Sequence, residues 1–332
     1  MEKVLLTGAG GFIGSHLAEA LVTEGVRLRA FVRYNSRGDP GLMRQIDPHI
    51  LDSIELISGD LTDGDAVRRA VRGCDTVFHL GALISIPYSY FHPEQVVTTN
   101  VMGTLNVLLA SRDASVERFV HTSTSEVYGT ARSVPISEDH PLQGQSPYSA
   151  SKIGADKLAE SFYCAFGLPV VTVRPFNTFG PRQSARAVIP TIITQALTQP
   201  EIQLGSLETR RDFTYVADTV AGFMKAAKVP GVDGQVFNLG TGREVWIADL
   251  AQMILKLAEE RLPEGQALPV LAKDTRRMRP EKSEVMRLLS DNSHARAGLN
   301  WAPQVSLEDG LRQTMDWIST HLDLYRPGVY EF

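Results

Sequence analysis

The sequence of 332 residues predicts an α/β fold built on a doubly wound parallel sheet, followed by a smaller mixed region. Three observations lead to this prediction. Short apolar runs alternate with amphipathic segments through the first half, a glycine-rich turn follows the first run, and beyond Pro175 shorter elements are separated by prolines. Alternating strands and helices of this kind imply parallel strands covered by helices on both faces.

Six apolar runs have the length of buried strands, and they lie at 3–7, 27–32, 54–58, 76–80, 118–123 and 170–174. Apolar residues recur at helical spacing in four intervening or following segments, at 15–24, 63–71, 95–112 and 150–166. In the second half, the basic cluster within 270–284 predicts a mobile loop.

A glycine-rich turn follows the first predicted strand and opens the first helix, with the residues Gly8, Gly11, Phe12, Ile13 and Gly14. Glycines at this spacing permit a tight turn, close approach of the backbone to a pyrophosphate and close helix packing, and the helix N-terminus faces the anion. We therefore expect residues 1–175 to form a dinucleotide-binding Rossmann domain. Residues 176–332 are expected to form a smaller substrate-binding region that interleaves with it.

The end of the second predicted strand indicates which dinucleotide binds. Arg33 stands where an acidic residue would bind the ribose 2′-hydroxyl of NAD, and with Asn35 and Ser36 it favours the 2′-phosphate of NADP. Arg33 can instead stack on adenine, so NAD stays an alternative. Four further residues follow the third and fourth strands and are expected to contact the cofactor: Asp60, Leu61, Leu80 and Ala82.

Composition argues against several other classes of protein. The chain carries 33 Lys and Arg against 38 Asp and Glu, a net charge of −5, and no basic run predicts a nucleic-acid partner. No apolar run reaches membrane-spanning length, and the first strand begins too early for a signal peptide, so we expect a cytoplasmic protein with no membrane partner. The eight His and two Cys show no metal-ligand spacing, so no metal is expected.

Residues 122–152 carry the strongest indication of catalysis. Tyr148 precedes Lys152 by four residues, which places both on one helical face, where the ammonium can lower the pKa of the phenol. Thr124, Ser125 and Glu126 add hydroxyls and a carboxylate at the end of a predicted strand. Together they predict a site that oxidises an alcohol to a ketone and then moves a proton beside that ketone.

The chain resembles the extended short-chain dehydrogenase/reductases that act on nucleotide sugars. The similar segments are Gly8 to Gly14, Gly59-Asp60-Leu61, Asn100 in Thr-Asn-Val-Met-Gly-Thr, Ser-Thr-Ser-Glu-Val-Tyr-Gly at 123–129, Tyr148 with Lys152, Arg174-Pro175-Phe176-Asn177 and Arg211-Asp212-Phe213. The resemblance implies a tightly bound NADP or NAD that is regenerated in each turnover. It adds Asn100, Tyr148, Lys152 and Pro175 to the cofactor site.

The resemblance also implies individual roles. Tyr148 would take the proton from the sugar 4-hydroxyl, Lys152 would hold the nicotinamide ribose, and Thr124 would hydrogen-bond the oxygen at C4. Asn100 would anchor a water or a backbone carbonyl, with a helix N-cap as the alternative. The substrate diphosphate would be bound by Asn177, Arg211 and Arg279.

Residues 124–126 indicate the reaction that follows oxidation. A 4-epimerase needs only re-reduction from the other face, whereas Glu126 can remove the acidified C5 proton so that water leaves from C6. The Thr-Ser-Glu triplet is similar to that of GDP-mannose 4,6-dehydratases and of UDP-glucuronate decarboxylases, and it lacks the Asp of the dTDP-glucose 4,6-dehydratase triplet. The acid that protonates the leaving hydroxyl, Glu126 or a water, stays open.

A narrower resemblance is to the UDP-N-acetylglucosamine 4,6-dehydratases of the configuration-retaining, legionaminic acid type. It rests on the segments 85–90, 141–148 and 182–190. It implies UDP-N-acetylglucosamine as the substrate and an acetamido pocket formed by the loop after the fourth strand. The implied contacts in these segments are Ser85, Pro87, Tyr88 and Val188. In this family the helices at 95–112 and 150–166 pair across a two-fold axis, which implies a homodimer through a four-helix bundle.

Two alternatives remain open. The first is another enzyme of the same family, either a UDP-hexose 4-epimerase or a UDP-glucuronate decarboxylase in which Arg186 would receive the C6 carboxylate. The second belongs to a different class, a non-catalytic NADP-binding regulator. Such a regulator would have no need of Thr124, Tyr148 and Lys152.

Overall fold

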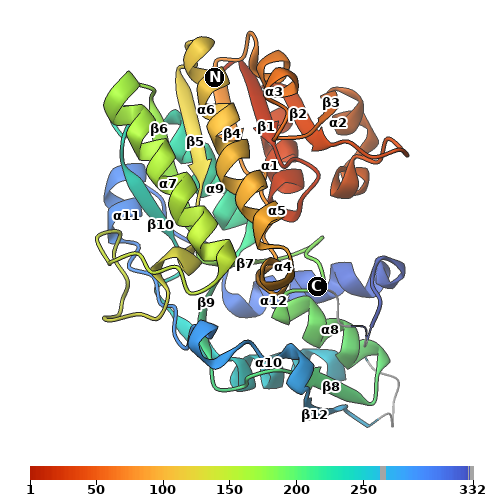
Figure 1. Ribbon diagram of the computed structural model, residues 1–332. Helices are drawn as coiled ribbons and strands as arrows, with labels where there is room; N and C mark the ends of the chain where they lie inside the picture. Colours follow the sequence, from red (N-terminus) through yellow and green to blue (C-terminus); the bar gives the residue numbers. More distant parts are fainter. Residues whose placement is uncertain (262–266, 328, 330–332) are drawn as a thin grey trace.

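The computed structural model describes residues 1–261, 267–327 and 329, and its main element is a seven-stranded sheet (Figure 1). All neighbouring strands in this sheet are parallel, in the order β10-β6-β5-β4-β1-β2-β3. The strands are β1 (Lys3–Thr7), β2 (Arg27–Arg33), β3 (Glu55–Gly59), β4 (Thr76–His79), β5 (Arg118–Thr122), β6 (Val170–Pro175) and β10 (Val236–Leu239). The strand order reverses between β1 and β4, so the predicted doubly wound sheet is confirmed.

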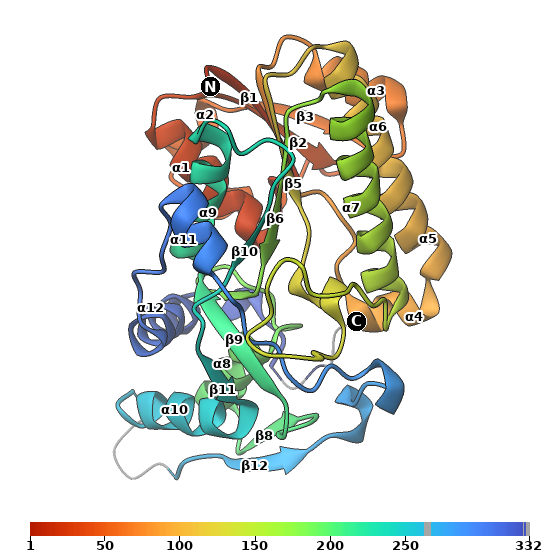
Figure 2. The ribbon, with the colours of Figure 1, turned by 90° about the vertical axis from the view of Figure 1, so that its left-hand side faces the viewer.

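Helices cover both faces of the sheet (Figure 2). One face carries α1 (Phe12–Thr23), α9 (Val216–Lys228) and α11 (Ser293–Leu299), and the other carries α3 (Gly64–Val71), α6 (Gly103–Asp113) and α7 (Pro147–Phe166). The two faces bury separate apolar clusters, because successive residues of a strand point to opposite sides. In β1, Val4 and Leu6 belong to the cluster with α1 and Leu5 belongs to the cluster with α3 and α6.

The predicted helix at 95–112 is not continuous. The structure divides it into α5 (Pro93–Val97), a π-helical turn (Thr98–Met102) and α6. The turn places Asn100 in the interior, where its amide both accepts from the backbone N–H of Leu83 at 2.7 Å and donates to the Leu83 carbonyl at 2.9 Å. Asn100 therefore braces the loop after β4, and it caps no helix.

Apart from β10, α9 and α11, the elements after β6 form a lower layer beneath the carboxyl ends of the main strands (Figures 1 and 2). Its strands are β7 (Asn177–Phe179), β9 (Arg210–Tyr215) and β11 (Glu244–Trp246) in one sheet, and β8 (Glu201–Leu204) and β12 (Val270–Lys273) in another. Its helices are α8 (Val188–Thr198), α10 (Ile247–Glu259) and α12 (Leu307–Thr320). The prediction that 270–284 is a loop is wrong at its start, because β12 pairs in parallel with β8.

Both halves of the chain contribute to the main sheet. The edge strand β10 pairs with β6, and α9 packs against β5 and β6. We propose that residues 1–175 and residues 176–332 form two units. Two elements of the second unit, β10 and α9, pack within the first. In the described part of the chain, no helix combines the length and apolar character needed to cross a membrane.

Candidate active site

A cavity of about 1670 Å³ lies where the parallel strands end. Its wall includes Gly8 after β1, Arg33 at the end of β2, Leu80 after β4, Thr122 at the end of β5 and Pro175 at the end of β6. The carboxyl edge of such a sheet, at the point where strand order reverses, is the usual place for a ligand. The lower layer supplies the opposite wall.

The turn after β1 is shaped to admit a dinucleotide. Gly8 has a φ of +73°, and a Cβ there would lie 2.7 Å from the backbone nitrogen of Gly81. A Cβ on Gly14 would lie 2.1 Å from the carbonyl oxygen of Gly8. No side chain caps the N-terminus of α1. The turn therefore keeps backbone close to the cavity and presents helix N–H groups to an anion, so the residues present fit a pyrophosphate.

The loop after β2 presents a cation to the same cavity. Arg33 is exposed on the cavity wall. Asn35 also lines the cavity, but its amide is occupied within the loop: it accepts from Asp39 N–H at 2.9 Å and donates to the Asp39 carbonyl at 2.8 Å. Asn35 thus braces the loop, and Arg33 is a charged group exposed on the cavity wall at the end of β2.

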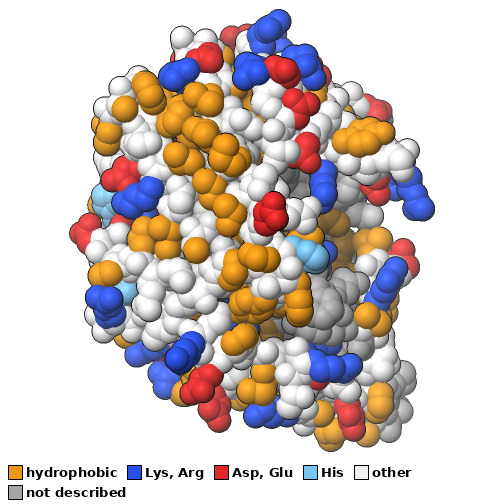
Figure 3. All heavy atoms as spheres, viewed as in Figure 1, with side chains coloured by type: hydrophobic (Ala, Val, Ile, Leu, Met, Phe, Trp, Pro, Cys, Tyr) orange, Lys and Arg blue, Asp and Glu red, His pale blue; other side chains and the backbone are white. Residues whose placement is uncertain are grey.

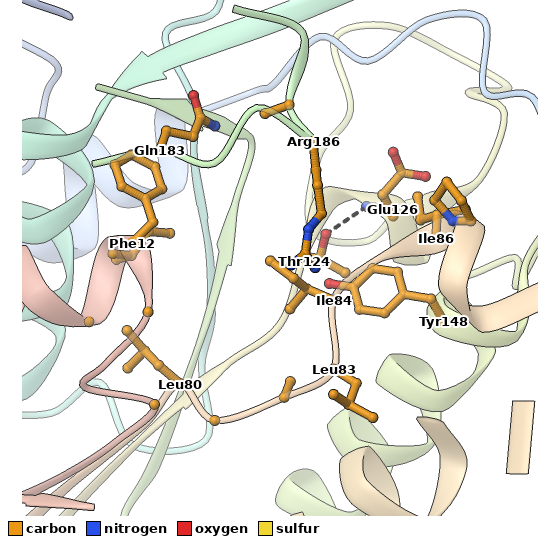
Figure 4. Close-up of a pocket in the computed structure, with 18 of the residues that line it drawn as sticks. Phe12, Leu80, Leu83, Ile84, Ile86, Thr124, Glu126, Tyr148, Gln183 and Arg186 are labelled. Atoms are coloured by element: carbon orange, nitrogen blue, oxygen red, sulfur yellow. Dashed lines mark hydrogen bonds between the residues drawn. The ribbon is translucent and has the colours of Figure 1, made fainter. Parts of the chain in front are cut away.

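Three of the predicted catalytic residues meet on one side of the cavity (Figure 4). Thr124 follows β5 and accepts a hydrogen bond from the backbone N–H of Glu126 at 3.2 Å, which begins a 3₁₀ turn (Ser125–Tyr128). Tyr148 lies in the first turn of α7, and its hydroxyl points toward Thr124. A hydroxyl, a carboxylate and a phenol are therefore brought together by two elements that are distant in sequence.

Lys152 lies one turn further along α7 and is buried behind this group. Its ammonium donates to the carbonyl oxygen of Thr122 at 2.7 Å. Burial lowers the pKa of Lys152 to about 8, and the nearby Asp156 carboxylate opposes that shift. Burial also raises the pKa of Tyr148 well above its ordinary value, with the Thr124 hydroxyl opposing. The lowering of this phenol's pKa by Lys152 stays a prediction, and burial acts against it.

Asp156 anchors a buried polar network beneath the site. Its carboxylate accepts from Ser123 Oγ at 2.7 Å and from Arg174 Nη2 at 3.1 Å, and it contacts His121 Nε2 at 3.0 Å. Arg174 also donates to the hydroxyl of Tyr128 at 3.0 Å. The network joins α7 to the ends of β5 and β6, so it holds Tyr148 and Lys152 against the strand that carries Thr124.

The substitution Asp156→Asn is expected to lower the free energy of unfolding by about 3 kcal/mol, because it leaves the buried guanidinium of Arg174 without its counter-charge. Urea denaturation followed by circular dichroism measures the change. Glu160→Gln on the same helix is the control, since the Lys157–Glu160 pair is exposed and its loss should cost less than about 0.5 kcal/mol. Equal effects of the two substitutions would contradict a structural role for the network.

Charged groups from the lower layer line the other end of the cavity. Arg211 on β9 lies 3.4 Å from Glu284, and Arg279 lies 3.6 Å from Glu126. Asn177 and Val188 are also on the wall, as predicted for a diphosphate and sugar site. Arg186, from the loop before α8, points into the cavity toward Thr124 and Tyr148 (Figure 4).

Most of the predicted site residues lie on this one cavity: Gly8, Gly11, Phe12, Ile13, Gly14, Arg33, Asn35, Ser36, Asp60, Leu61, Leu80, Ala82, Pro87, Thr124, Glu126, Tyr148, Pro175, Asn177, Val188, Arg211 and Arg279. Five lie off its wall: Ser85, Tyr88, Asn100, Ser125 and Lys152. Ser85 caps α4 (Ile86–Phe91), and the hydroxyl of Tyr88 donates to Gln95, so neither side chain is directed at a sugar in this structure.

Some wall residues were not predicted. Ile84 and Ile86 flank the predicted Ser85, and Gln183 and Glu284 come from the lower layer. The signal for Ile84 and Ile86 was their place in the loop after the fourth strand. For Glu284, the available signal was a carboxylate five residues after Arg279, and nothing in the sequence placed it beside Arg211.

Comparison with known proteins gives one family and two activities. Residues 5–314 match the model of the family described as GDP-mannose 4,6 dehydratase. The dTDP-D-glucose 4,6-dehydratase of Mus musculus is 30% identical over 320 residues, which cover 95% of this chain and 88% of that protein. The UDP-glucose 4-epimerase of Mycolicibacterium smegmatis is 32% identical over 322 residues, 95% of this chain and 98% of that protein.

A solved structure has the same fold along nearly the whole length of this chain. DesIV, a dTDP-glucose 4,6-dehydratase from Streptomyces venezuelae solved with NAD bound, superposes with a TM-score of 0.85 at 28% identity, and the alignment covers 98% of this chain and 99% of DesIV. The relatives thus include enzymes that dehydrate nucleotide sugars and enzymes that epimerise them.

Proposed function

This chain belongs to the GDP-mannose 4,6-dehydratase family of nucleotide-sugar enzymes, and from that premise we propose that it is a nucleotide-sugar 4,6-dehydratase acting on UDP-N-acetylglucosamine. The observation that carries the proposal is the position of Glu126, a carboxylate on the same cavity wall as Thr124 and Tyr148. An epimerase has no use for a base beside C5, whereas a dehydratase requires one.

In the proposed mechanism, Thr124 binds the oxygen at C4 and Tyr148 takes the proton of the 4-hydroxyl. A bound nicotinamide cofactor supplies the acceptor and later the donor of the hydride. Lys152, whose ammonium donates to the Thr122 carbonyl, would hold the nicotinamide ribose with a remaining N–H group. Glu126 then removes the C5 proton, which the C4 ketone has made acidic, and water leaves from C6. The stored hydride would return to C6 and a proton to C5, which gives the 4-keto-6-deoxy sugar. Glu126 or a water protonates the departing hydroxyl.

The choice of UDP-N-acetylglucosamine rests on the loop after β4. Ile84, Ile86 and Pro87 give the cavity an apolar wall beside Tyr148, which suits the methyl group of an acetamido substituent (Figure 4). The test is mass spectrometry of the purified enzyme with this substrate and no added reductant. A product lighter by one water supports the proposal, and an unchanged mass with UDP-N-acetylglucosamine contradicts it.

Arg186 favours a second candidate function. Its side chain points toward Thr124 and Tyr148, where a guanidinium would bind the C6 carboxylate of a hexuronate. The enzyme would then be a UDP-glucuronate decarboxylase or a 4-epimerase. Incubation with UDP-glucuronate distinguishes the decarboxylase from the epimerase. Loss of carbon dioxide indicates the decarboxylase. A new sugar configuration at unchanged mass, detected by nuclear magnetic resonance, indicates the epimerase.

We propose that the cofactor is NADP or NAD, held by the turn after β1. DesIV was solved with NAD, whereas the exposed Arg33 supports NADP. If Arg33 binds the 2′-phosphate, Arg33→Ala should weaken NADP binding by about tenfold and leave NAD binding within about twofold. Fluorescence titration of both dinucleotides measures this. Arg27→Ala is the control, since Arg27 is exposed at the other end of β2 and lies off the cavity wall. Equal weakening of NADP and NAD would indicate that Arg33 stacks on adenine.

We also propose a homodimer formed through α6 and α7. Figure 3 shows hydrophobic side chains over these helices, and exposed apolar residues of the same region include Val97, Met102 and Phe166. The double substitution Met102→Glu and Phe166→Glu should convert a dimer to a monomer in light-scattering measurements, because it places charges in an apolar interface. Val270→Glu, at an exposed apolar residue on β12, should leave the mass unchanged. A monomeric unsubstituted protein would contradict the proposal.

A further inference from the structure

Four charged side chains form a compact cluster in the cavity. Arg211 and Arg279 are the two cations, and Glu126 and Glu284 are the two anions. Burial lowers the pKa of Arg211, and the charge of Arg279 adds to that effect while Glu126 opposes it. Burial also works against the charge of Arg279, yet Glu126 and Glu284 raise its pKa above the ordinary value. The two guanidiniums therefore depend on these carboxylates, and the cluster as a whole is neutral.

The contact between Arg279 and Glu126 is loose. Nη1 of Arg279 lies 3.6 Å from Oε1 of Glu126, beyond hydrogen-bonding distance. This buried nitrogen has no hydrogen-bond partner among the described residues. It therefore retains the capacity to donate to a further acceptor in the cavity, such as an oxygen of a phosphate.

The segment that follows Arg279 is held in place. Ser283 Oγ donates to the carbonyl of Gln145 at 2.7 Å, and the amide of Gln145 donates to the carbonyl of Lys282 at 3.1 Å. The hydroxyl of Tyr90 lies 2.6 Å from Ser283 Oγ. These bonds tie the segment to α4 and to Gln145, just before α7. Arg279 is thus kept near Glu126, and a ligand that binds Arg279 must share it with that carboxylate.

We propose that the substrate diphosphate and Glu126 compete for Arg279, so that nucleotide binding releases the carboxylate that acts at C5. The proposal rests on the proposed function for the identity of Glu126 as the base. A diphosphate brings about two negative charges to a neutral cluster, which leaves more anions than cations. The more loosely held anion, Glu126, is the one that loses its partner. Glu284 keeps its contact with Arg211 and acts as a positioning residue.

The test is the affinity for UDP, measured by isothermal titration calorimetry without turnover. Glu126→Gln should tighten UDP binding by about tenfold, because it removes the competitor from Arg279. In an Arg279→Met background, the same Glu126→Gln substitution should give a smaller gain in affinity than in the unsubstituted protein, since only the effect of Glu126 on Arg211 remains. Glu94→Gln is the matched control: Glu94 is an exposed carboxylate on the same cavity wall and is not an ion-pair partner of either arginine.

Three results would overturn the proposal. Unchanged UDP affinity in Glu126→Gln would show that no competition exists. An equal gain in the Arg279→Met background, or an equal gain from Glu94→Gln, would show a general effect of charge. Failure of the unsubstituted protein to bind UDP, dTDP or GDP would overturn both this proposal and the proposed function. UDP could bind with the predicted dependence of the Glu126→Gln effect on Arg279 while no substrate loses water. That result would contradict only the dehydratase activity.

Discussion

Tyr148→Phe is expected to reduce turnover by about 10³-fold while leaving dinucleotide binding unchanged. The hydroxyl is the only group removed, and the ring stays in a buried position at the start of α7. Without it, no group at this position takes the proton of the sugar 4-hydroxyl, so the first oxidation does not proceed. The rate of product formation measured by mass spectrometry, together with a dinucleotide titration, gives both quantities.

Tyr163→Phe is the matched control for this prediction. Tyr163 lies on the same helix, is more than a third exposed and does not line the main cavity, so its substitution should leave turnover within about twofold. Full activity of Tyr148→Phe would contradict the assigned role. If the unsubstituted protein binds dinucleotide and turns over no nucleotide sugar, the alternative of a non-catalytic regulator is favoured.

Glu126→Gln is expected to reduce the loss of water by about 10²- to 10⁴-fold, because the amide cannot take the C5 proton. The reaction in deuterium oxide provides the second readout. The unsubstituted enzyme should place deuterium from solvent into the sugar product, and the variant should form neither labelled nor dehydrated product. Mass spectrometry of the nucleotide sugar measures both changes in one experiment.

Glu94→Gln again serves as the control, since it removes a carboxylate from the same wall without removing one beside Thr124 and Tyr148. Full activity of Glu126→Gln would show that the elimination mechanism is wrong. The two main predictions also separate the candidate enzymes. A 4-epimerase would lose activity in Tyr148→Phe and keep it in Glu126→Gln, because it removes no proton from C5.

Six of the seven strands of the main sheet were predictable because their signals are local, whereas the edge strand β10 was missed. Each of the six predicted strands begins and ends within one residue of the observed strand, since a buried parallel strand is a short, continuous apolar run. The glycine turn was predictable for a similar reason. Gly8 and Gly14 occupy places where a Cβ would meet backbone atoms, so both positions require glycine. The sequence shows this requirement as the spacing of Gly8, Gly11 and Gly14.

The site was only partly predictable. The pairing of Tyr148 with Lys152 follows from helical spacing, but no local pattern indicated that the ammonium would bind the Thr122 carbonyl or that burial would raise the pKa of Tyr148. Asn100 was assigned to the cofactor and was also expected to anchor a water or a backbone carbonyl. The carbonyl contact is confirmed, because a π-helical turn directs the side chain inward to the Leu83 backbone. Such outcomes depend on neighbours from other elements.

The sequence by itself determined six strands of the main sheet, the dinucleotide turn and the residue types of the catalytic group, because periodicity, glycine spacing and helical spacing act over a few neighbouring residues. Only the tertiary structure decided that Glu284 faces Arg211, that Arg279 shares the cavity with Glu126 and that Arg186 points toward Tyr148. These residues come from a layer that reaches the sheet through long-range packing. Charges that are distant along the chain interact only after that packing sets their distances and removes water from between them.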